Sequence, residues 1–190
     1  MKIHHPTEHI HDANEALQML KDGNERFLAG KPIHKVYCNI DREVYSFGQK
    51  PFAVVITCSD SRVAPEIFFD QNLGDIFIIR NAGNIVDKVV LGSMEYAIEY
   101  LETRLVVVCG HSYCGAVKAA CSSDEFPPKI KHIIEYIKPA AIKGGDMDEI
   151  IRRHVEYQVA HIKNDAIVKR LKIMVAGAHF DIRSGAVKWF

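Results

Sequence analysis

Residues 52–62 read FAVVITCSDSR, and residues 105–115 read LVVVCGHSYCG. Each stretch is a short apolar run, rich in β-branched side chains, that ends in residues able to bind a metal or transfer protons. The runs at 76–79 and 172–176 are also largely apolar. Runs without polar alternation are typical of strands that are buried on both faces of a parallel sheet. We therefore predict a central, mostly parallel β-sheet.

Helical spacing of apolar residues fills the segments between these runs. It predicts helices over 12–30, in which Gly23 is a weak point, over 89–101 and, as one long helix, over 148–171. The chain closes with a turn and a short strand at 186–190. Strands that alternate with helices indicate an α/β fold, with a mostly parallel central sheet flanked by helices.

The composition bounds the class of protein. A chain of 190 residues with 48% hydrophobic and 25% charged residues is typical of one globular domain, which we place at 1–190. Lysine and arginine total 24, as do aspartate and glutamate, so a net charge of zero argues against a nucleic-acid or membrane-surface partner. No apolar run reaches the roughly 18–20 residues of a transmembrane helix, and the N-terminus lacks a signal-peptide core. We expect a cytoplasmic protein.

Reactive side chains directly follow two of the predicted strands: Cys58, Asp60 and Arg62 follow one, and His111 and Cys114 follow another. Ligands bind at the carboxyl ends of parallel strands, so Cys58, His111 and Cys114 converge if these strands are neighbours. Two thiolates and an imidazole suit zinc, and a catalytic zinc site leaves its fourth position to water. Asp60 is close enough in sequence to be a fourth ligand. An Asp60–Arg62 ion pair would instead hold the carboxylate off the metal.

These residues also have less specific interpretations. Cys58, Cys114 and His111 could be a buried cysteine pair beside a core histidine, or part of a redox site, although their spacing is not that of a usual dithiol. Among the other polar residues, we interpret Cys109 as a core residue, and His154 and His161 as surface or interface residues. Asp75 and Arg80 could orient the site, but we interpret them as an ordinary salt bridge.

The motifs CSDSR at 58–62 and GHSYCG at 110–115, together with RNAGN at 80–84, resemble the β-class carbonic anhydrases, and the resemblance extends over essentially the whole chain. It implies reversible hydration of CO2 to bicarbonate and a proton, by attack of zinc-bound hydroxide. Carried over by position, Cys58, His111 and Cys114 bind one Zn²⁺ per subunit, and Asp60 with Arg62 forms the catalytic dyad.

The resemblance further implies a small substrate pocket. Gln49, Phe77, Ala82 and Tyr96 match its lining positions, with Tyr96 supplied by a partner subunit, and Gln49 favours a site in which Asp60 is not a ligand. Family members are dimers or multiples of dimers, so we expect a homodimer or homotetramer. The amphipathic segment 1–30, with no sheet beside it in sequence, is expected to be a helical arm that packs on the partner subunit.

Two alternatives remain open. A hydrolase of carbonyl sulfide or carbon disulfide would share the zinc ligands, although Gln49 and Phe77 favour the CO2 enzyme. A non-catalytic zinc or redox-sensing protein is the other, and the Asp60–Arg62 pair argues against it because a purely structural zinc needs no such clamp.

Overall fold

A computed structural model of the chain describes residues 12–33, 43 and 45–190. Its centre is a five-stranded sheet in the order β2-β1-β3-β4-β5. Neighbouring strands run parallel except β4 and β5, which are antiparallel. The strands are β1 (Ala53–Cys58), β2 (Ile76–Asn81), β3 (Leu105–His111), β4 (Met174–Phe180) and β5 (Val187–Trp189). The predicted α/β class is confirmed, and the strands begin and end close to the predicted positions.

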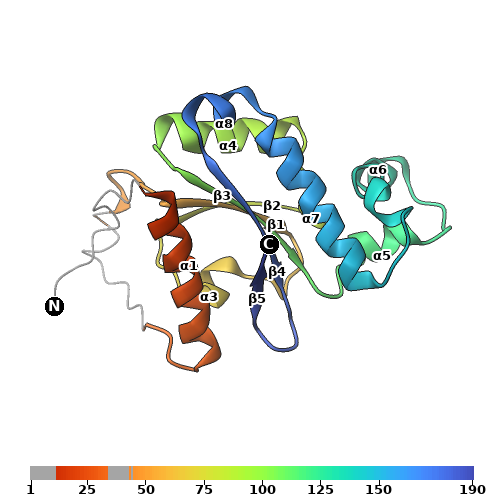
Figure 1. The fold of residues 1–190 in the computed structure, drawn as a ribbon, viewed down its shortest axis with the longest axis horizontal. Coiled ribbons are helices and arrows are strands. Elements are labelled where there is room, and N and C mark those ends of the chain that lie inside the picture. The colour runs from red at the N-terminus through yellow and green to blue at the C-terminus, as the bar shows by residue number, and fades with distance from the viewer. Residues whose placement is uncertain (1–11, 34–42, 44) are drawn as a thin grey trace.

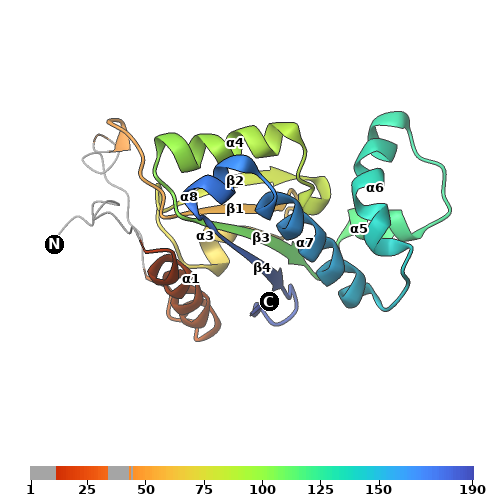
Figure 2. The same ribbon diagram turned by 45° about the horizontal axis from the view of Figure 1, so that its top comes forward.

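Helices cover both faces of this sheet (Figure 1). In Figure 1, α4 and α8 lie above the strands and α1 and α3 lie below them, and in Figure 2, α5 and α6 lie beyond one end of the sheet. The helices are α1 (Ala13–Leu28), α3 (Pro65–Phe68), α4 (Lys88–Tyr100), α5 (Gly115–Cys121), α6 (Pro128–Ala141), α7 (Met147–Lys163) and α8 (Ala166–Leu171), with a short 3-10 turn, η1 (Ala82–Asn84). None of these helices is long and apolar enough to cross a membrane.

Two layers of the core lie on opposite faces of β1 and β3, and a third cluster lies among α5, α6 and α7. Every residue of these two strands is buried, as their continuous apolar runs predict. Val54 and Val106 pack on the side of α4 and α7, whereas Val55 and Val107 pack on the side of α1 and α3. The prediction that the apolar runs are strands buried on both faces is wrong for β2. This strand is only half-buried, because it lies at the edge of the sheet.

The long helix predicted over 148–171 is two helices. Asp165 separates them, because its carboxylate accepts hydrogen bonds from the amides of Ile167 and Val168 and so caps the start of α8. The left-handed Lys172, at φ 52°, then ends α8, and β4 begins at Met174 rather than at 172. Helices α3 and α6 were not predicted, although Pro128 in the first turn of α6 and the helical spacing of Ile130, Ile134 and Ile137 are signals for the second of them.

Helix α1 packs on its own chain. Ala16 and Leu20 are buried in the same layer as Phe68. The Asn24 amide donates hydrogen bonds of 2.9 Å to the carbonyls of both Phe68 and Gly185. Although no strand lies beside it in sequence, this helix therefore covers the sheet of its own chain. Packing of segment 1–30 on a partner stays a prediction, and residues 1–11 lie outside the described part of the chain.

Candidate metal centre

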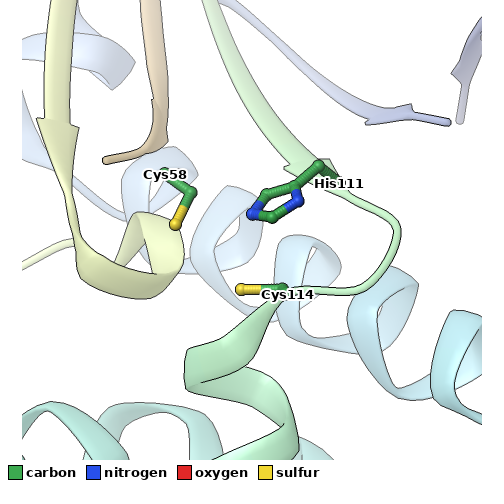
Figure 3. A group of neighbouring side chains, drawn as sticks. All are labelled: Cys58, His111 and Cys114. Atoms are coloured by element: carbon green, nitrogen blue, oxygen red, sulfur yellow. The ribbon is translucent and has the colours of Figure 1, made fainter. Parts of the chain in front are cut away.

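The register of the sheet brings the reactive residues to one edge. β1 and β3 are parallel neighbours, with Thr57 opposite Cys109, so both strands end at the same side of the sheet. Cys58 ends β1, His111 ends β3, and Cys114 immediately precedes α5. Figure 3 shows the three side chains pointing toward one another. Their ligand atoms all lie within 4.8 Å of one another, and all three residues are buried.

The imidazole of His111 is oriented for a metal. Its Nδ1 lies 2.9 Å from the carbonyl oxygen of Ser112, which requires Nδ1 to carry the proton. Nε2 therefore holds a lone pair, and this buried atom has no hydrogen-bond partner among the described residues. An unpartnered buried acceptor is costly unless something binds it. This nitrogen and the two sulfurs form a donor set that fits zinc.

The two thiols are not equivalent. The hydrogen bond from Cys114, together with that from the Gly83 amide, lowers the pKa of Cys58 to about 4. Cys114, which gives the hydrogen bond and is itself buried, has a raised pKa. Without a metal ion the pair thus shares one proton. Binding of a metal requires both sulfurs as thiolates and replaces that proton.

Arg62 holds Asp60 outside this group. Its Nε and terminal nitrogen donate hydrogen bonds of 2.9 and 2.7 Å to the two carboxylate oxygens, which is a bidentate pair. These side-chain hydrogen bonds keep the pKa of Asp60 well below its usual range, so the carboxylate is ionised. Arg62 also lies 3.4 Å from the carbonyl of Tyr113, which ties the Asp60 loop to the loop that carries His111 and Cys114.

Arg80 orients the same loop from β2. It donates hydrogen bonds of 3.1 Å to the carbonyl of Cys58 and 2.8 Å to the carbonyl of Asp60. Its interpretation as one half of an ordinary salt bridge is thus wrong. The spacing of Asp75 and Arg80 suggested a charge pair, but Arg80 lies beside the end of β1, where backbone carbonyls need donors.

The pocket residues are dispersed within one chain. Ala82 is exposed beside Gly83, whose amide contacts Cys58, and Gln49 is exposed in the segment before β1. Phe77 pairs with Val54, four residues before Cys58, so it lies about 13 Å from the cluster along the strand. The ring of Tyr96 is 6.5 Å from that of Phe77. A role for Phe77 and Tyr96 in a pocket therefore stays a prediction that depends on a second subunit.

Two polar residues of α7 escaped the sequence reasoning. His154 is completely buried within its own chain, so its interpretation as a surface or interface residue is wrong, and Gln158 is buried beside it. A signal was present, because His154 follows Ile151 by three residues and Gln158 follows His154 by four, which places both on the apolar stripe. His161 is exposed, as expected, and Cys109 is a core residue whose pKa burial raises to about 12.

A family model described as carbonic anhydrase matches residues 53–187. The chain belongs to the carbonic anhydrase family. Carbonic anhydrase 2 of Mycobacterium tuberculosis is 40% identical over 184 residues, covering 90% of this chain and 89% of the relative. The carbonic anhydrase of Mycolicibacterium smegmatis is also 40% identical, and the match covers 91% of each chain.

Solved structures place this carbonic anhydrase in the β class. A tetrameric β-carbonic anhydrase from the ascomycete Sordaria macrospora superposes with a TM-score of 0.72 at 26% identity, covering 93% of this chain and 92% of that one. The matched segment of the family model contains the metal cluster, Asp60 and Arg62, whereas Gln49 lies just outside it.

Proposed function

We propose that this protein catalyses the reversible hydration of CO2 to bicarbonate and a proton at one zinc ion per subunit, held by Cys58, His111 and Cys114. The observation that carries the proposal is the buried cluster itself, with all ligand atoms within 4.8 Å and with Nε2 of His111 unpartnered among the described residues. Zinc bound by three protein ligands supplies Lewis-acid activation of a water molecule near neutral pH.

Asp60 and Arg62 orient the water that attacks CO2. The Asp60 carboxylate accepts a hydrogen bond from that water, because both its oxygens are fixed by Arg62 and it stays ionised. A carboxylate with so low a pKa cannot hold the proton that the reaction releases. It therefore acts as a hydrogen-bond acceptor that orients the water. The proton passes on to solvent and buffer. Arg62 also prevents the carboxylate from taking up a position on the metal.

The substrate CO2 is small and uncharged, so it requires an apolar surface and one polar group for the developing carboxylate. Ala82, Phe77 and Tyr96 are the proposed apolar lining, and the amide of Gln49 is the proposed donor. Because Phe77 and Tyr96 lie far along the sheet from the cluster of their own chain, the lining is completed across a subunit contact.

We therefore propose a homodimer or a homotetramer of the single domain 1–190. The outer face of β2 and α4 is the proposed contact. Strand β2 lies at the edge of the sheet. On α4, three large side chains are exposed: Val89 by 75%, Tyr96 by 48% and Tyr100 by 76%. Three large apolar side chains exposed on one helix mark a candidate subunit interface. The relatives from Sordaria macrospora are described as tetrameric.

The deciding experiment is stopped-flow CO2 hydration on protein of measured zinc content, between about pH 6.5 and about pH 9. Hydration that scales with zinc content supports the proposal. Cys114→Ser should lose both zinc and activity, whereas Cys121→Ser, which alters an exposed cysteine outside the cluster, should keep both. Full zinc occupancy without hydration at any of these pH values would overturn the proposed activity.

A further inference from the structure

The turn η1 donates a hydrogen bond to one of the zinc-binding sulfurs. The amide of Gly83 lies 3.3 Å from Sγ of Cys58. Gly83 has a left-handed φ of 77°, a conformation that favours glycine, and a Cβ there would crowd Cδ1 of Ile137 at 2.7 Å. The direction in which the N–H group of Gly83 points therefore depends on the residues that hold η1 in place.

Helix α7 holds the turn from behind. Nε2 of His154 lies 2.8 Å from the carbonyl oxygen of Gly83, the same residue whose amide faces Cys58. Oε1 of Gln158 accepts a 2.9 Å hydrogen bond from the amide of Val86, two residues past the end of η1. The side-chain nitrogen Nε2 of Gln158 lies 3.5 Å from Nδ1 of His154.

These contacts form one chain of hydrogen bonds in which it is determined which atom donates and which accepts. The Val86 amide fixes which end of the Gln158 side chain is the acceptor, so its NH2 group faces Nδ1 of His154. Nδ1 is then the acceptor, and Nε2 carries the proton that it donates to Gly83. Burial, which lowers the pKa of His154, favours this neutral form. His154 and Gln158 are both buried, so few other donors compete.

We propose that His154, supported by Gln158, is a positioning residue that aims the Gly83 amide at Cys58 and thereby tunes the bond between this sulfur and the metal. The proposal rests on the zinc site of the proposed function but assigns a role to residues outside it. A thiolate that accepts a hydrogen bond gives less charge to a metal, which stays a stronger Lewis acid. Hydrogen bonds in a chain also strengthen one another.

The test uses the full-length protein loaded with cobalt(II), whose sulfur-to-metal charge-transfer absorption reports the electron density on the thiolates. His154→Leu removes the donor to Gly83, whereas His154→Gln keeps an N–H group at a comparable reach. Ile162→Ala, two turns further along α7 and fully buried, is the control for a general loss of packing. Zinc affinity is measured in parallel by chelator competition.

For His154→Leu we expect the charge-transfer band at longer wavelength and the midpoint of the pH profile of kcat/KM at higher pH, because Cys58 then gives more charge to the metal. Zinc affinity should be lower by about 10-fold, because the Gly83 amide no longer orients the Cys58 ligand. His154→Gln should restore most of each change, and Ile162→Ala should keep the wild-type band even though its melting temperature falls. A wild-type band and zinc affinity in His154→Leu, or the same changes in Ile162→Ala, would overturn the proposal. Wild-type protein that binds cobalt but fails to hydrate CO2 would overturn only the proposed activity, since the band shift is scored without turnover.

Discussion

The ion pair of Arg62 and Asp60 determines where the carboxylate beside the candidate metal centre lies. Arg62 binds both oxygens of Asp60, so the carboxylate is not free to join Cys58, His111 and Cys114. Arg62→Ala should lower kcat/KM for CO2 hydration by about 10–100-fold while zinc content stays unchanged, because the released carboxylate can bind the metal.

Two further variants make this prediction specific. Arg62→Lys keeps the charge but loses the bidentate geometry, so its activity should lie between those of wild type and Arg62→Ala. Arg183→Ala removes an exposed arginine that stacks on Tyr113 and should leave turnover near the wild-type value. Loss of zinc together with activity in Arg62→Ala would contradict the role of Arg62.

His154 should make the protein less stable in acid. Burial lowers its pKa below the ordinary 6.5, so the native state takes up this proton only at lower pH than the unfolded chain does. Its contribution to the free energy of unfolding therefore falls as the pH drops below about 6.5. His154→Gln cannot titrate and should lose less stability between about pH 7.5 and about pH 5.5, as measured by urea unfolding.

The control for this measurement is His161→Gln, which removes an exposed histidine from the same helix and should keep the wild-type pH dependence. If His154→Gln and wild type lose equal stability over this pH interval, His154 is not the group responsible.

At the scale of elements, the contact between α1 and the end of α3 depends on Gly23. A Cβ at this position would lie 1.7 Å from the carbonyl oxygen of Phe69, so the helix must move away to accept any side chain. Alanine normally stabilises a helix by about 1 kcal/mol relative to glycine. Here we expect Gly23→Ala to destabilise the protein by about 1–3 kcal/mol, because overpacking outweighs helix propensity.

Thermal unfolding checks this prediction, with Glu25→Ala on the exposed side of α1 as the control of unchanged stability. An increase in melting temperature for Gly23→Ala would mean that α1 does not approach α3 as described.

At the scale of the whole molecule, the exposed aromatic face of β2 and α4 should control assembly. Tyr100 is 76% exposed, and its ring lies 5.4 Å from that of Tyr96. Tyr100→Asp should shift the protein toward monomers in sedimentation velocity and reduce CO2 hydration, because a buried charge is costly at a subunit contact. Ile142→Asp alters an equally exposed apolar residue, beside α6, and should change neither. A fully active monomer would contradict the shared pocket.

Much of the candidate site could be predicted because its signals are local. Cys58 and His111 directly follow apolar runs, and parallel neighbours end at the same edge, so their convergence required only the order of two strands. The division of 148–171 into two helices had a local signal too, since Asp165 is a good cap, but apolar periodicity continues past it and concealed the break.

The sequence by itself determined the α/β class, the buried strands and the group of Cys58, His111 and Cys114 that could hold a metal. Burial on both faces selects apolar residues, and ligand chemistry selects cysteine and histidine. Only the tertiary structure decided that α1 covers its own sheet, that Arg80 binds the loop of Cys58, and that His154 contacts Gly83. His154 and Gly83 are 71 residues apart. Such contacts depend on how α7 packs across the end of the sheet, and a buried histidine carries no local mark of the carbonyl it will meet.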